Sequence, residues 1–265
     1  MTKTELLNKT AQNPEERLLL ARALDKLELA RQRGVPACTG FLSPQERLSL
    51  ERLLQADGHP RHLFFGGFEG AERTICAFLP DWQEEADWLE DEDCPVCCLR
   101  CSFPEGSNLA HPDFLGSILG LGITREKLGD LLVGETTCDL IVLREIAEFL
   151  LLHLESAGRT HLKVNRFDLA DLVPQAVELK IIRDTVATLR FDAVAASAFS
   201  MARGKASDLI SGGKIQLNHA PCIKTDRAIA QGDVLTARGL GKCVVKTVGG
   251  LSKKGRINIE LERYV

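Results

Sequence analysis

The order of helix and strand signals in the last third of the chain constrains its fold more than any other feature. Segment 202–210 is expected to form a helix with one apolar face, because four apolar residues recur there at helical spacing: Ala202, Ala206, Leu209 and Ile210. Gly212-Gly213 ends this helix, and residues 215–217 alternate apolar and polar side chains, as a half-buried strand does. We interpret residues 185–192 as a preceding helix. Together these segments predict a small helix–helix–strand module.

Charge separates this module from the rest of the chain. Residues 181–265 contain 14 Lys and Arg against 7 Asp and Glu, a net charge of +7. The whole chain of 265 residues has a net charge of −4, so residues 1–180 carry −11. An acidic body joined to a basic C-terminal module is typical of a protein in which one part binds nucleic acid, and the alternative is a solvated charged face. Arg203 and Lys205 open the second predicted helix.

The first 90 residues predict helices followed by a β-hairpin. Residues 14–33 have the pattern of one amphipathic helix, and Ser43-Pro44 has the cap and first-turn proline of another. Segments 62–68 and 73–79 are rich in strand-forming residues and are separated by a glycine-containing turn. Residues 81–93 contain eight acidic residues in thirteen positions, and we interpret them as a solvated linker or edge that marks the first domain boundary.

The middle of the chain predicts a β-α-β-β-α-β order, the ferredoxin-like or RRM-like arrangement. The expected elements are a strand, a helix, two strands, a helix and a strand, at 95–103, 111–120, 131–135, 138–143, 144–156 and 161–167. Such sheets often bind RNA by stacking bases on strand aromatics. Here the strands offer only Phe103 and Phe167, so we expect contact instead around Thr124, Arg125 and Lys127. The fold class is α+β, with domains at 1–90, 91–178 and 179–265.

Four thiols lie within eight residues: Cys94, Cys97, Cys98 and Cys101. A zinc site usually takes two cysteine pairs separated by a loop that lets them converge, and here the pairs adjoin directly. On the predicted strand their side chains would alternate between faces. We therefore expect a structural role in the core and no bound metal.

Three other patterns resemble catalytic motifs. Arg190-Phe191-Asp192 resembles the Arg-Leu-Asp motif of pseudouridine synthases, but we expect Asp192 to orient Arg190 or cap local backbone. His111 and Asp113 could be a base with its orienting carboxylate or two metal ligands, and we favour capping and local packing. The last of the three patterns, glycines at positions 116, 120, 122 and 129, lacks the spacing of a nucleotide-binding loop and indicates close packing or contact with RNA.

Several of these segments resemble known families. Segment 183–240 resembles the S4 RNA-binding domain. The run from His111 to Asp130, HPDFLGSILGLGITREKLGD, is similar to the central signature of the YlmH family of bacterial S4-domain proteins. Further similarity lies in FGGF at 65–68 with AER at 71–73, and in RGLGK at 238–242 with KKGR at 253–256. The chain departs from the family at Ala202, where Ser is usual, and at Pro112, where Arg is usual.

The resemblance implies a non-catalytic factor that binds large-subunit ribosomal RNA and tRNA and acts on stalled large ribosomal subunits in ribosome-associated quality control. No cofactor is expected. The residues themselves predict only that a basic C-terminal module binds structured RNA. The candidate RNA contacts are Arg190, Asp192, Arg203, Lys205, Lys214, Asn218, Lys242, Lys253, Lys254, Arg125 and Lys127.

Two alternatives remain: an RNA-modifying enzyme that uses an S4 domain for targeting, and an interaction protein of the cell-division machinery. We expect a cytoplasmic monomer that does not bind membranes. An odd count of nine cysteines fits a reducing compartment, and the first residues lack an apolar signal core.

Overall fold

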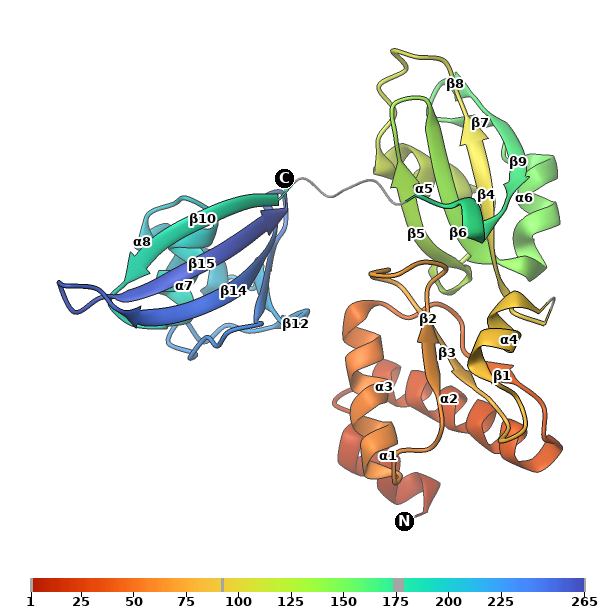
Figure 1. Cartoon of the computed structure of the whole chain (residues 1–265), viewed down its shortest axis with the longest axis horizontal. Helices are drawn as coiled ribbons and strands as arrows, with labels where there is room; N and C mark the ends of the chain where they lie inside the picture. The colour runs from red at the N-terminus through yellow and green to blue at the C-terminus, as the bar shows by residue number, and fades with distance from the viewer. Residues whose placement is uncertain (1, 92, 174–178, 265) are drawn as a thin grey trace. The chain divides into compact units, whose positions relative to one another are not determined.

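The computed structural model describes residues 2–91, 93–173 and 179–264 (Figure 1). The predicted α+β class is confirmed, because helices and several β-sheets alternate along the chain. The chain divides into two compact units, residues 1–175 and 176–265. The division predicted near residue 90 therefore falls inside the first unit, and the one predicted near 178 lies close to the unit boundary.

Three helices open the first unit, and two of them begin as predicted. They are α1 (Lys3–Thr10), α2 (Pro14–Arg33) and α3 (Pro44–Ala56). Asn13 caps α2, and Ser43 caps α3 by accepting from the Glu46 N–H at 3.3 Å. Gly34 ends α2 with a φ of 63°, a left-handed conformation that glycine adopts without steric cost. Leucines of the three helices pack together with Cys76 and Phe78 of the adjoining sheet.

That sheet contains the predicted hairpin. β2 (Leu63–Phe65) and β3 (Ile75–Phe78) are antiparallel, and β1 (Ala37–Cys38) pairs with the other edge of β3. The four residues of β3 are all buried, because the strand has helices on one face and a second apolar cluster on the other.

The acidic stretch at 81–93 does not link two domains, contrary to the prediction, although its described acidic residues are exposed to solvent as expected. It contains α4 (Glu85–Glu90), whose Trp88 is fully buried. Trp88 packs in a cluster with Ile75, Cys94 and Leu143. Glu85, Asp87 and Glu90 lie on the exposed surface of this short helix, which one large apolar side chain anchors to the core.

The central part has the β-α-β-β-α-β order along the chain. Its main elements are β4 (Val96–Ser102), α5 (His111–Gly120), β5 (Leu128–Val133), β6 (Thr137–Leu143), α6 (Ala147–His153) and β9 (Lys163–Phe167). The strands form one antiparallel sheet in the order β5-β6-β4-β9. Helix α5 has the predicted bounds, whereas β5 begins three residues earlier than expected and α6 is shorter. Three 3-10 turns and a small β7–β8 hairpin complete it: η1 (Arg125–Lys127), η2 (Arg144–Ile146), η3 (Leu169–Asp171), β7 (Ser156–Ala157) and β8 (Thr160–His161).

The two faces of this sheet belong to different cores. One face packs against α5 and α6, through residues such as Leu99, Phe114 and Leu150. The other face contributes Cys98 and Ile141 to the cluster that holds Trp88. This second cluster joins the first 90 residues to the central sheet.

Hydrogen bonds and close packing reinforce the junction between the first 90 residues and the central sheet. The Phe41 N–H donates to the Glu126 carbonyl at 2.7 Å, and a Cβ on Gly129 would lie 2.8 Å from the Phe41 ring. The Arg73 guanidinium donates to the carbonyls of Leu128 and Arg125 at 2.8 and 2.9 Å. Asp130 accepts from the Arg73 N–H at 3.2 Å. Residues 1–175 therefore fold as one unit.

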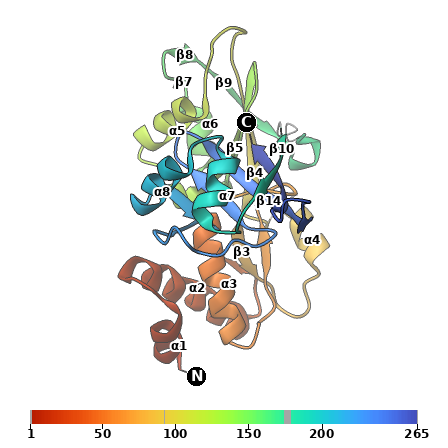
Figure 2. The same cartoon turned by 90° about the vertical axis from the view of Figure 1, so that its left-hand side faces the viewer.

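The second unit is a six-stranded antiparallel sheet with two helices. Its elements are β10 (Leu179–Val186), α7 (Phe191–Ala198), α8 (Arg203–Ser211), β11 (Ile215–Leu217), β12 (Ala220–Pro221), β13 (Val234–Ala237), β14 (Gly241–Leu251) and β15 (Ile257–Tyr264). The strand order is β10-β15-β14-β13-β11-β12. Helices α7 and α8 pack side by side, and their apolar faces share one core with the sheet (Figure 2).

The prediction for residues 185–192 is wrong. Thr185 and Val186 end strand β10, where they pair with Asn258 and Ile257, and α7 begins only at Phe191. The segment satisfies its backbone groups with a strand more than 70 residues away in sequence, which no local pattern reveals. Helix α8 and the following strand lie where predicted, and Ala206 and Ile210 of the predicted apolar face are fully buried. Ala202, which was expected on the same face, is instead the exposed N-cap residue. Within the described residues, no helix has the length and apolar character needed to cross a membrane.

Candidate nucleic-acid interface

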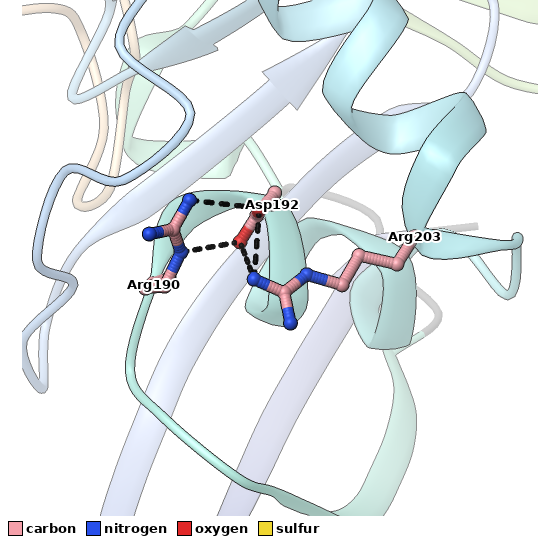
Figure 3. A network of polar contacts seen from close by, with 3 residues as sticks. All are labelled: Arg190, Asp192 and Arg203. Carbon is pink, nitrogen blue, oxygen red and sulfur yellow. Dashed lines mark hydrogen bonds and ion pairs between the residues drawn. The ribbon is translucent and has the colours of Figure 1, made fainter.

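The starts of α7 and α8 meet at one buried carboxylate (Figure 3). Asp192, in the first turn of α7, is 5 % exposed. Arg190 donates to it from Nε and Nη2 at 3.3 and 3.2 Å. Arg203 donates from Nη2 to both oxygens at 3.1 and 3.0 Å. We call Arg190 and Arg203 the arginine pair. The expectation that Asp192 orients Arg190 agrees with this geometry, and Asp192 orients Arg203 as well.

Electrostatics keep this carboxylate charged. Burial alone would raise the pKa of Asp192, but the hydrogen bonds and positive charges of Arg190 and Arg203 together outweigh burial and lower its pKa below the ordinary value. The arginine side chains are 40 % and 52 % exposed, so part of each guanidinium faces solvent. A guanidinium has five N–H donors, and those not used by Asp192 are available for a phosphate.

The local backbone fixes where the pair lies. Arg190 is the N-cap residue of α7, and its backbone forms an isolated bridge with Ala228. The N–H groups of Phe191 and Asp192 donate to the carbonyls of Arg227 and Thr225 at 2.8 and 3.0 Å. The loop before β13 therefore lies along the start of α7. It also carries Lys224 and Arg227, both exposed residues that were absent from the predicted contacts. Their proximity depends on these long-range bonds, which the sequence does not signal.

Lys205 adds a third cation at the start of α8. It is exposed and lies in the first turn, two residues after Arg203. The N-cap residue Ala202 has no side-chain oxygen to accept from the helix, so the first N–H groups of α8 can meet a bound anion. We call Arg190, Arg203 and Lys205 the helix-start surface.

Lys214, Asn218 and Lys242 lie elsewhere in the second unit. Lys214 follows the other end of α8, about 14 Å away for nine residues at helical rise. Lys242 lies at the start of β14, with its Nζ 4.1 Å from the centre of the Tyr264 ring. Asn218, with a φ of 50°, donates to Asp233 and accepts from the Val234 N–H, both at 2.8 Å. The Asn218 amide therefore holds a turn together.

The tip of the β14–β15 hairpin forms a second cationic group. Lys253 and Lys254 are exposed in the turn, and Arg256 ends it. The Arg256 guanidinium reaches back to β10, where Nε donates to Thr185 Oγ1 at 2.9 Å. Arg256 was part of the family resemblance but not of the predicted contacts.

The two candidate contacts in the first unit also interact with other residues of the protein. Arg125 and Lys127 lie in the 3-10 turn η1, which leads directly into β5. The Arg125 carbonyl accepts from Arg73, and Lys127 forms an ion pair with Glu145. Asp113 accepts from the Ala110 N–H at 2.8 Å and so caps α5, as expected. Burial, and then the charge of Arg125, lower the pKa of His111, which favours its neutral form.

The central sheet does not present the aromatic side chains on which many RNA-binding sheets stack bases. Phe103 is 7 % exposed and packs near Phe114. Phe167 is partly buried, and the Arg100 guanidinium lies 3.4 Å from its ring centre. Arg100 also forms a bidentate pair with Asp139 at 2.6 and 2.7 Å. The two strand aromatics are thus occupied by the protein itself.

The four clustered cysteines alternate between the two cores, as the strand prediction required. Cys97 and Cys101 pack against the helices, whereas Cys94 and Cys98 belong to the cluster around Trp88. Burial raises the pKa of all four thiols, to about 12 for Cys98 and Cys101. Within the described residues, no group of three or more metal-ligating side chains converges.

Comparison with known proteins places the chain in a family. A family model described as "Putative RNA-binding domain in YlmH" matches residues 90–171. The "Ribosome-associated protein quality control protein P2" of Bacillus subtilis is 30% identical over 251 residues, which are 94% of this chain and 95% of that protein. The chain belongs to the YlmH family. This confirms the resemblance drawn from the sequence.

A solved structure of a YlmH protein has a similar fold over part of this chain. "Cell division protein ylmH from Streptococcus pneumoniae" is similar over 62% of this chain and 97% of its own length, with a TM-score of 0.50 and 20% identity. The segment matched by the YlmH model contains Arg125 and Lys127 and ends before the helix-start surface. Two separate parts of this family member therefore carry candidate RNA contacts.

Proposed function

We propose that this protein binds structured RNA through the helix-start surface and acts without catalysis. The observation that carries the proposal is the pair of guanidinium groups held by Asp192 beside the uncapped start of α8. Two oriented arginines, Lys205 and the helix N–H groups together form a site suited to phosphates. The net charge of +7 on residues 176–265 supports the same conclusion.

We further propose that residues 179–264 are an S4 domain and that the central sheet is a ferredoxin-like, RRM-like module. The strand order β5-β6-β4-β9 supports the second assignment. Because the strand aromatics of that sheet are occupied, recognition by the central sheet should rest on RNA shape and backbone. Arg125 and Lys127 would be accessory contacts.

The partners we propose are the large ribosomal subunit, its ribosomal RNA and tRNA, with a role in ribosome-associated quality control in the cytoplasm. The name of the Bacillus subtilis relative supports this role. A non-catalytic role is supported by Asp192, whose carboxylate already accepts from two arginines and is not free to act as a nucleophile. We propose that the protein works as a monomer.

Co-sedimentation with large ribosomal subunits across a salt series tests the proposal. Arg203→Ala combined with Lys205→Ala should remove most binding, and any residual binding should show a salt slope smaller by about 1 to 2. The melting temperature should fall only modestly, because both side chains are exposed and Arg190 still donates to the buried Asp192 after Arg203 is removed.

A matched control removes one arginine and one lysine from the same unit. Arg183 of β10 forms an ion pair with Glu260 of β15, and Lys246 of β14 forms one with Glu262 of β15. Arg183→Ala with Lys246→Ala should keep most binding. Wild-type sedimentation of the first double variant, or equal losses in both, would refute the proposed surface. Nuclease treatment should abolish the association if RNA carries it.

A further inference from the structure

A cavity of about 320 Å³ adjoins the helix-start surface. Its lining includes Arg203 of the arginine pair and Arg256 from the β14–β15 hairpin. The cavity therefore joins two of the cationic groups of the second unit. Its volume is near the lower end of the range for small-ligand sites, about 300–1,000 Å³.

Small side chains on α7 make room for this cavity. Ala193, Ala196 and Ser197 recur at helical spacing along its half-buried face and all line the hollow. A larger side chain at any of these positions would fill part of the space. The hollow thus depends on the residue choice of one helix face.

The arginines that line the cavity are both anchored. Arg203 is held by Asp192, and Arg256 is held by Thr185 through Nε at 2.9 Å and through a second bond to the Thr185 carbonyl. Each still has unused N–H groups, and a guanidinium plane can stack on a base. Two fixed cations favour a ligand that has a phosphate and a flat ring.

One carboxylate in the lining makes the cavity selective. Asp184 accepts from its neighbour, the Thr185 N–H, at 2.7 Å and from Ser197 Oγ at 2.6 Å. A carboxylate has about four acceptor sites, so Asp184 can accept further hydrogen bonds. It disfavours a phosphate next to it and favours the N–H groups of a base edge.

We propose that this cavity holds one unpaired nucleotide of the bound RNA, with its phosphate at Arg203 and its base beside Asp184. A base with an exocyclic amino group, such as guanine, fits the carboxylate better than uracil, which has none. This inference rests on the proposed function, since Arg203 serves both. It assigns the protein a preference for helices that contain an extruded nucleotide.

Binding of full-length protein to two RNA hairpins tests the inference: one fully paired, and one identical except for a single bulged guanosine. The bulged hairpin should bind at least about fivefold more tightly, the lower range for one stacked base. Ala196→Leu, which fills the cavity, should abolish this preference and keep the affinity for the paired hairpin. Ala230→Leu, at an exposed loop position outside the cavity, should leave the preference intact.

Two further comparisons guard against a folding artefact. Arg256→Ala, at an exposed residue, should also reduce the preference, and a bulged uridine should bind more weakly than guanosine, with the difference lost in Asp184→Ala. Equal wild-type affinity for both hairpins, or an unchanged preference in Ala196→Leu, would overturn the cavity assignment while leaving RNA binding intact. If the wild type binds neither hairpin, the proposed function itself fails.

Discussion

At the scale of single residues, Asp192 decides how the arginine pair is presented. Removing a negative charge from a basic surface should strengthen RNA binding if only net charge mattered. If Asp192 instead positions Arg190 and Arg203, its loss should weaken binding, because both guanidinium groups become free to rotate. The two mechanisms therefore predict opposite changes in RNA affinity when Asp192 is replaced.

We expect Asp192→Asn to weaken RNA binding about tenfold, the equivalent of one charge-assisted hydrogen bond. Filter binding at fixed salt would measure this, and Asp208→Asn, at an exposed residue of α8, is the matched charge control. Tighter binding by Asp192→Asn would rule out the positioning role.

The same carboxylate should affect stability in acid. The folded-state pKa of Asp192 is lower than its unfolded value, because the hydrogen bonds and charges of Arg190 and Arg203 together outweigh burial. Its stabilising contribution is therefore present above about pH 4 and lost as the pH falls through the folded-state pKa. Urea unfolding between about pH 5 and about pH 3, measured on wild type and Asp192→Asn, should give a shallower pH dependence for the variant. Parallel curves would contradict this linkage.

Thiol reactivity tests the cysteine assignment. Seven of the nine cysteines are buried, and Cys38 is partly buried with its pKa raised to about 12 by burial. We expect fast labelling of Cys222 alone in the native protein and of all nine thiols after unfolding. Protein purified under reducing conditions should contain far less than one equivalent of zinc and stay folded with a chelator. Rapid labelling of Cys94 or Cys97, or a tightly held metal, would refute the structural role.

At the scale of elements, local signals succeeded where the cap and the apolar face lie in one segment. Helix α3 has Ser43 and Pro44 at its start. Helix α5 has Pro112 in its first turn and Asp113, whose carboxylate accepts from the Ala110 N–H, so both helices begin where predicted. Strand β10 could not be found this way, since Val186 pairs with Ile257 far along the chain. Candidate contacts followed the same rule: Arg203 and Lys205 share a helix turn, whereas Arg256 reaches the site only through the fold.

Helix α4 shows how one side chain can override the pattern around it. Trp88 is fully buried, and its indole Nε1 has no partner among the described residues. Trp88→Ala should cost about 3–5 kcal/mol of unfolding free energy, the usual range for a buried aromatic. Trp88→Phe should cost clearly less, because it keeps a ring and removes the unpaired N–H. Chemical denaturation measures both, and a cost near zero for Trp88→Ala would restore the linker interpretation.

At the scale of the whole molecule, charge and fold divide the chain at the same place. Residues 1–175 carry a net charge of −11 and residues 176–265 one of +7. Each unit also has hydrophobic clusters made only of its own residues. The sequence could locate the charge division, but the merging of the first two predicted domains depends on packing between distant segments.

Fragments cut at this boundary should differ in RNA binding. Residues 176–265 alone should retain measurable affinity for structured RNA, with a steep salt dependence, and residues 1–175 should bind weakly. Fluorescence anisotropy at matched salt would compare them, after circular dichroism has shown that each fragment folds. Equal affinities would shift the main contact to Arg125 and Lys127.

The apolar cluster shared by Trp88, Ile75 and Cys98 determines how the central segment would behave on its own. The segment that matches the RNA-binding family model begins at residue 90, so a protein trimmed to that match would lose Phe41, Ile75 and Trp88. The face of its sheet that these residues cover would then be an exposed, aggregation-prone apolar patch. Such a fragment should aggregate, and its poor behaviour would reflect a missing cover, not an inability to bind RNA.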